Sequence, residues 1–246
     1  MATLVQNCSS VFTVCFLSLA VRCQPLSRAL GVFMVKLDKS NLEKVLHHDL
    51  TLNDKYKFDR AFDSIGYQSE YCCYHYAEFV RNYKNHKLAM YGELDEEIKN
   101  PQYYRIGFEA NAIAFFRCLH SLVESVPYIL NIIFQIKDDK ESRNVDWRLI
   151  KNFCDHNNIY ETRKLIEEMQ KLPSYNELSL LVNISKHRRL LRVDSGLFSD
   201  SPSAKFLEKD FEDKFQSYNI QDLMERFYYD LHPYVLRVIN SCGTNS

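Results

Sequence analysis

The sequence has little glycine and little proline, with only six residues of each among 246. β-Sandwiches need many turns rich in these residues, and many nucleotide-binding folds need a glycine-rich phosphate loop, so both classes are disfavoured. The GxGxxG, P-loop, GxSxG and HExxH motifs are absent from the sequence. Stretches in which apolar and polar residues alternate are scarce too. The chain is therefore predicted to be all-α, built as an antiparallel helical bundle.

A large charge of one sign is missing as well, because the formal net charge is -1. No overall field steers the protein towards nucleic acid, so any such role must depend on a local patch. The eight cysteines are irregularly placed and include no CxxC pair, which argues against a disulfide framework and a zinc site. We therefore expect reduced thiols in a cytoplasmic protein that needs neither a metal nor another cofactor.

What the sequence does contain is one long apolar helix, predicted over Phe108–Ile136. A membrane span is not expected there, because Arg117, His120 and Glu124 would lie near the middle of the bilayer. Pro127 removes one backbone donor and is expected to kink the helix. The apolar residues recur at steps of three and four, the spacing of one helical face: Ala112, Ile113, Phe116, Leu119, Val123, Val126, Leu130 and Ile133. This pattern is typical of the central helix of a bundle.

The chain is predicted to divide into three parts. Residues 1–33 do not resemble the rest of the chain and are expected to be a non-core extension. They are either a weak amphipathic segment or upstream codons, with the natural start at Met34, and we favour the second interpretation. Residues 34–101 are predicted to be an N-terminal helical segment, and residues 102–240 the main bundle. Further expected helices are Asn41–His47 with Ser40 as its cap, a short helix through Cys154 with Asp146 as its cap, Tyr160–Leu172, Ser174–Arg192, and roughly Ser203–Asn240 with a break near Tyr218-Asn219.

A short basic stretch stands at the end of the helix expected over Ser174–Arg192. It places four cations and a histidine within seven residues, namely Lys186, His187, Arg188, Arg189 and Arg192. On a helix, Asn183 and His187 share one face, and Arg188 and Arg192 share the adjacent one. Such side chains are suitable hydrogen-bond donors to a phosphate, and an arginine can donate two hydrogen bonds to it at once. Cations near a helix C-terminus also complement the helix dipole without any ligand, so both interpretations stay open.

Two motifs together carry a family resemblance. Residues 183–188 read Asn-Ile-Ser-Lys-His-Arg, and they follow a helix that carries Leu119-His120-Ser121 and then Glu124. In this order the motifs resemble the HEPN superfamily (higher eukaryotes and prokaryotes nucleotide-binding), most closely a bacterial subgroup with an Asn-x-x-Lys-His-Arg motif. The resemblance covers about residues 102–240, and it implies an antiparallel helical bundle that forms a homodimer.

Many HEPN proteins are metal-independent ribonucleases of toxin–antitoxin and defence systems. For this chain the resemblance implies a catalytic set of His187, Asn183, Arg188 and Lys186, with RNA contacts from Arg189 and Arg192. The sequence departs from the common signature of the superfamily, in which an arginine precedes the histidine. Asn183 is the polar residue upstream of His187, and an asparagine cannot supply the missing charge.

Other polar features of the sequence have a structural and a functional interpretation. His120, Ser121 and Glu124 form a polar cluster on the apolar helix, which is either a buried hydrogen-bonded network or a support for the site. Our hypothesis is that Glu124 or Ser121 orients His187 or Asn183 across the bundle. The pairs Arg81/His86 and Arg226/His232 also fit the Arg–His spacing, but chance predicts such matches, and Arg81/His86 is expected at a solvated helix end.

Two functions of different classes are compatible with these residues. The first is a HEPN-like homodimer that binds RNA and cuts it without a metal, with His187 as acid and base. The second is a non-catalytic helical module that binds RNA, a nucleotide or a protein partner such as an antitoxin. The retained His187 and the dense cations favour the first function. The arginine missing upstream of His187 favours the second.

Overall fold

The computed structural model describes residues 37–46, 50–93, 100–199, 202–206 and 219–243. The non-core extension expected over residues 1–33 lies outside the described residues, as does the choice between Met1 and Met34. The described chain from residue 37 onwards belongs to one compact unit, which spans Met34–Ser246. The segments 34–101 and 102–240 therefore share one core, and residue 101 does not separate two compact units.

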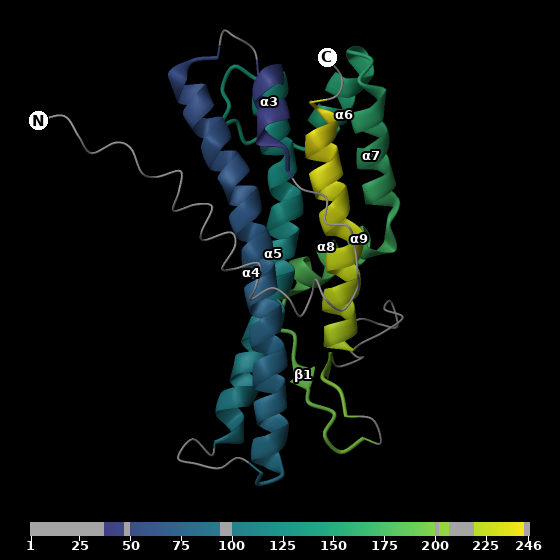
Figure 1. Ribbon diagram of the computed structural model, residues 1–246. Helices are drawn as coiled ribbons and strands as arrows, with labels where there is room; N and C mark the ends of the chain where they lie inside the picture. Colours follow the sequence, from purple (N-terminus) through teal and green to yellow (C-terminus); the bar gives the residue numbers. More distant parts are fainter. Residues whose placement is uncertain (1–36, 47–49, 94–99, 200–201, 207–218, 244–246) are drawn as a thin grey trace, which may run out of the picture. The chain divides into compact units, whose positions relative to one another are not determined.

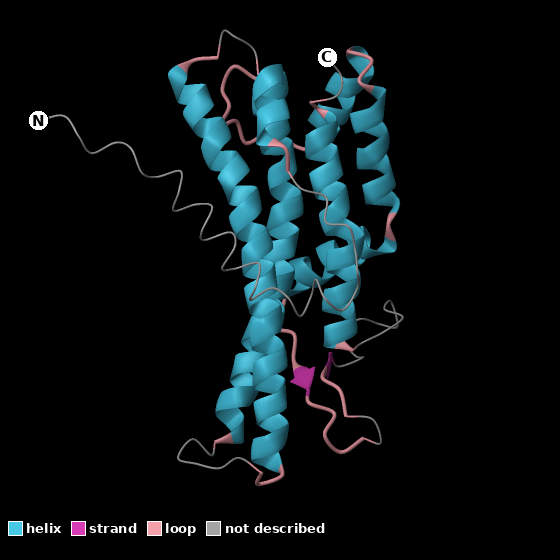
Figure 2. Ribbon diagram, in the orientation of Figure 1, coloured by secondary structure: helices cyan, strands magenta, loops and turns pink. Residues whose placement is uncertain are grey.

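The described residues are mostly helical, as Figures 1 and 2 show, which confirms the predicted all-α bundle. In chain order the helices are α3 (Lys39–Val45), α4 (Leu52–Met90), α5 (Pro101–Phe134), α6 (Trp147–His156), α7 (Tyr160–Lys171), α8 (Pro173–His187) and α9 (Ile220–Ser241). Two short antiparallel strands, β1 (Val193–Asp194) and β2 (Lys205–Phe206), lie between α8 and α9.

Helix α5 is the central element, because α4, α6, α8 and α9 all pack against it. Every apolar residue of the predicted face is buried, from Ala112 to Ile133, which confirms the helical face predicted from the periodicity. Phe116 contacts the rings of Phe227 on α9 and Phe206 on β2, which joins distant parts of the chain. Burying one such side chain contributes roughly 1.5–3 kcal/mol, so this helix supplies much of the stability of the core. The helix begins at Pro101, earlier than predicted, and continues through Pro127.

Helices α4 and α5 pack closely over much of their length. Gly107 of α5 lies against Asn82 of α4, where a Cβ atom would come within 2.5 Å of the Asn82 side-chain oxygen. Asn82 is buried and donates its amide to the carbonyl of Glu78 at 2.7 Å. His86 is also buried, with Nδ1 3.0 Å from the carbonyl of Pro101. The Arg81/His86 pair therefore does not lie at a solvated helix end, because His86 ties α4 to the start of α5.

Of the helix caps predicted from the sequence, one is confirmed and one is corrected. The predicted cap at Asp146 is confirmed, since its side chain accepts from the N–H of Leu149 at 2.8 Å. Asn158 adopts φ 59°, and α7 begins after it. The cap predicted at Ser40 is wrong, because Ser40 is already inside α3. Asp38 caps this helix and accepts from the N–H of Asn41.

The predicted ends of the last two helices are also wrong. Helix α8 ends at His187 instead of Arg192, and the chain continues as an extended segment into β1. Phe206 belongs to β2, so the helix expected from Ser203 does not begin there, whereas α9 begins at Ile220, capped by Asn219, directly after the predicted break. Gly196 has a left-handed φ of +62° and lies in the loop that follows β1.

Among the described residues, α5 is the one helix that is long and apolar enough to cross a membrane. More than half of its most apolar stretch is buried inside the protein. The core position of the helix accounts for its composition.

We expect Gly107→Ala to lower the free energy of unfolding by about 1–3 kcal/mol, because the added methyl group meets the pinned Asn82 side chain. Gly66→Ala in α4 is the matched control. No atom lies within 4 Å of a Cβ atom there, so the better helix former should raise stability by up to about 1 kcal/mol. Denaturant unfolding measures both changes, and an equal effect of the two variants would contradict the close crossing of α4 and α5.

Candidate functional site

The residues of the Asn-x-x-Lys-His-Arg motif lie at the end of α8 and just beyond it. Asn183, Lys186 and His187 belong to its last turns, whereas Arg188, Arg189 and Arg192 follow the helix. All six side chains are exposed. We call residues 186–192 the basic ledge.

Helix α8 ends at the ledge because the burial of side chains changes there from a helical pattern to an alternating one. The N–H groups of Arg188 and Arg189 both donate to the carbonyl of Ile184, at 3.0 and 3.1 Å, which closes the last turn. Beyond this turn burial alternates, with Leu191 and Val193 inward and Leu190, Arg192 and Asp194 outward. A period of two is that of a strand. The expectation that Arg188 and Arg192 share a helical face is therefore wrong.

Polar side chains of α5 hold the backbone of this segment at both ends. Arg117 donates to the carbonyl of Ser185 at 2.8 Å, beside the start of the ledge. Arg105 donates to the carbonyl of Val193 at 3.2 Å, and Glu109 accepts from the N–H of the same residue at 3.1 Å. Figure 1 shows the chain after α8 (green) passing beside α4 and α5 on its way to β1.

Arg105, Glu109 and Arg117 lie on one face of α5, at steps of four and eight residues. The Glu109 carboxylate is also 3.8 Å from Arg105 Nε and 3.9 Å from Arg192 Nε. One carboxylate thus faces two guanidinium groups at this end of the ledge. Arg105 and Glu109 were not predicted from the sequence as site residues, although their spacing on an otherwise apolar helix was a usable signal.

His120 and Glu124 continue the polar face of α5, and Lys186 of the ledge lies near both. Desolvation, and secondarily the charge of Lys186, lowers the pKa of His120 from 6.5 to about 4. Desolvation raises the pKa of Glu124, and Lys186 opposes that rise. The described residues show no hydrogen bond from Glu124 or Ser121 to His187 or Asn183. The charge of Lys186 therefore influences the pKa values of His120 and Glu124, whereas Ser121 is exposed.

A series of interactions leads from Glu124 through Tyr175 of α8 to α7 and α6. Its charge raises the pKa of Tyr175 on α8, although desolvation is the larger cause of that rise. The hydroxyl of Tyr175 accepts from Gln170 of α7 at 3.5 Å, and Gln170 accepts from Lys151 of α6 at 3.0 Å. Four helices therefore contribute to one polar edge next to the basic ledge.

His187 and Asn183 have no described hydrogen bond or ion pair to this edge. Both are exposed, and the structure shows no hydrogen bond to either side chain from the residues it describes. They are four residues apart in α8 and so share a face, as predicted. A ligand on this surface would reach both side chains without displacing a protein contact.

The other Arg–His pair also has a structural explanation. Arg226 forms an ion pair with Glu177 of α8. His232 Nε2 lies 3.0 Å from Ser69 Oγ of α4, and burial lowers the pKa of this histidine to about 4. Arg226 and His232 thus tie α9 to two different helices, and they do not act as a pair.

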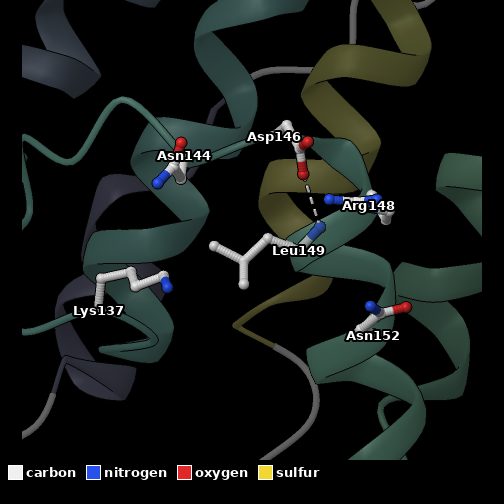
Figure 3. A pocket seen from close by; sticks show the side chains of 6 residues that line it. All are labelled: Lys137, Asn144, Asp146, Arg148, Leu149 and Asn152. Atoms are coloured by element: carbon white, nitrogen blue, oxygen red, sulfur yellow. Dashed lines mark hydrogen bonds between the residues drawn. The ribbon is translucent and has the colours of Figure 1, made fainter.

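None of the predicted site residues lines either of two pockets in the protein. A pocket of about 520 Å³ lies between the connector before α6 and α6 itself (Figure 3), where the Asp146 carboxylate turns to the N–H of Leu149. It is lined by Lys137, Asn144, Asp146, Arg148, Leu149 and Asn152. A second pocket is lined by Tyr56, Lys57, Arg60, Ala61, Ser64, Ser125, Tyr128 and Glu141. The ledge contributes to neither of these two pockets, and the side chains of Lys186, Arg188, Arg189 and Arg192 are exposed.

Comparisons with known proteins do not assign this site. No family model matches the sequence, and no curated protein or solved structure shows significant similarity to it. The HEPN resemblance therefore stays a prediction from the two motifs. Within the described ranges, no group of three or more His, Cys, Asp or Glu residues is arranged to hold a metal ion.

We expect NMR titration to show that His120 remains neutral at every pH well above its pKa of about 4. Because the folded pKa is lowered, the unfolded state binds more protons between pH 4 and 6.5, so His120 makes stability rise with pH across this window. Lys186→Gln should raise the His120 pKa, but not to 6.5, since desolvation is the larger cause. A His120 pKa near 6.5 in the unmodified protein would show that the imidazole is solvated and lies far from Lys186.

Proposed function

We propose that the protein binds RNA through the basic ledge. The observation that carries this proposal is the combination of exposed cations with a restrained backbone. Lys186, Arg188, Arg189 and Arg192 all reach solvent, while Arg117, Arg105 and Glu109 hold the chain at both ends. A surface that is ordered before binding loses less conformational entropy when a ligand arrives.

A polyanion suits this surface better than a small nucleotide does. Small ligands bind in concave, largely apolar pockets, whereas the ledge is open and charged. Lys and Arg side chains bind successive phosphates of a nucleic-acid backbone and release its counterions. The net charge of -1 gives no general attraction, so the binding energy must come from this local patch. The motif resemblance supports RNA as the polyanion.

Metal-independent cleavage is a second candidate function, favoured by the exposed pair of Asn183 and His187 beside the cations. A histidine can transfer protons near neutral pH. Arg188 would stabilise charge on the reacting phosphate, and Asn183 would position it. Lys186 influences the pKa values of His120 and Glu124 on α5, and its charge would add to the local field. The resemblance also implies a homodimer or a neutralising protein partner against the bundle.

Replacing ledge arginines should weaken RNA binding in a salt-dependent way. We expect Arg188→Ala/Arg189→Ala to lower affinity and to reduce the slope of log affinity against log salt by about 0.7 for each phosphate that is no longer neutralised. The matched control is Arg60→Ala/Lys164→Ala, which removes the same charge from exposed positions on α4 and α7. Electrophoretic shifts at increasing salt measure both slopes. An equal reduction in the two variants would show that only the total charge matters, and would contradict a site at the ledge.

Cleavage is tested with RNA in the presence of EDTA. If His187 is the acid and base, cleavage persists after chelation and falls by about 100-fold or more in His187→Ala. His156→Ala is the control, because His156 is an exposed histidine at the end of α6. Equal background in all three proteins would exclude catalysis by His187 while leaving RNA binding in place.

A further inference from the structure

The basic ledge continues into a hairpin that exposes apolar side chains. Leu190 is 65 % exposed and Phe198 is 96 % exposed, although Leu197 and Val193 beside them are buried. Leu190 and Arg192 point outward on the same side of the extended segment, since exposure alternates there. Across the strands, Asp194 pairs with Lys205, and both are exposed. Two exposed cations, Arg192 before β1 and Lys205 on β2, therefore flank the segment that leads to Phe198.

Hydrogen bonds from α4 and within the turn hold the backbone around Phe198. Tyr83 donates to the carbonyl of Ser195 at 2.8 Å, and Tyr91 donates to the carbonyl of Leu197 at 3.3 Å. The N–H of Ser199 donates to the carbonyl of Gly196 at 3.1 Å, which closes the turn. Gly196 has φ +62°, and a Cβ atom there would lie 2.3 Å from the carbonyl oxygen of Ser203. The aromatic ring therefore projects from a fixed turn.

We propose that Phe198 is a stacking platform for an unpaired base of the RNA bound at the ledge, an inference that rests on the proposed function. Cations bind the phosphates, and an aromatic ring next to them binds a base through its face. Stacking of this kind needs a base that is free of a duplex, because paired bases are covered by their neighbours. The chain is extended over residues 190–194, where successive outward positions are about 6.6 Å apart. This geometry suits a single strand lying along it.

Fluorescence anisotropy with the full chain tests this inference, using a labelled single-stranded oligouridine and an RNA duplex of the same length. We expect Phe198→Ala to weaken binding of the single strand by about 5- to 150-fold and to leave duplex binding unchanged. Phe198→Trp should retain the affinity, because it keeps an aromatic face. Tyr160→Ala is the matched control, since Tyr160 is an exposed aromatic residue on α7.

The outcomes separate this inference from the proposed function. If both RNAs bind and Phe198→Ala has no effect while Arg188→Ala/Arg189→Ala weakens binding, stacking is overturned and RNA binding stands. If neither RNA binds the unmodified protein, both proposals fail. If RNA does not bind but vesicles of phosphatidylserine and phosphatidylcholine do, and Phe198→Ala abolishes that binding, the hairpin is a membrane contact and both proposals are overturned.

Discussion

The contact between the polar edge of α5 and the chain that follows α8 is the constraint on which the candidate site depends. Most faces of α5 are apolar and buried against other helices, which fixes the helix in the core. The remaining edge presents Arg105, Glu109 and Arg117 to the backbone of residues 185–193. Backbone groups of an extended segment need partners, and charged side chains are strong ones. The same helix therefore organises the core and holds the ledge.

This arrangement explains how a nearly neutral protein presents a positive surface. The holding contacts use backbone atoms of Ser185 and Val193, so they leave the exposed side chain of Arg188 to solvent, while the exposed Arg192 also lies 3.9 Å from the Glu109 carboxylate. Lys186 differs from them, because it affects the pKa values of His120 and Glu124 on α5. The ledge thus combines cations that interact electrostatically with α5, namely Lys186 and Arg192, with exposed arginine side chains that can reach a phosphate. The anchored turn that carries Phe198 extends this surface past the cations.

Local patterns predicted the fold well where one period dominates. The apolar face of α5 and the cap at Asp146 depend on neighbouring residues, and the structure confirms both. The path after His187 was not predictable in the same way. Cations after a helical pattern fit a longer helix, whereas the alternation over residues 190–194 is too short to outweigh it. The strand forms because Val193 meets Glu109 and Phe206, which are distant in sequence. The influence of Lys186 on His120 and Glu124 was not predicted for the same reason, because these residues are distant in sequence.

Photo-cross-linking of the full chain to single-stranded RNA, with mass spectrometry of the cross-linked peptides, tests the central claim most directly. We expect the cross-links to fall within residues 186–198, on the ledge and its hairpin. The outer face of α4 offers an internal comparison, because Tyr67, Tyr71 and Tyr74 are exposed there and react as readily as other aromatic residues. Cross-links confined to that face of α4, with none on the ledge, would contradict an RNA site held by α5.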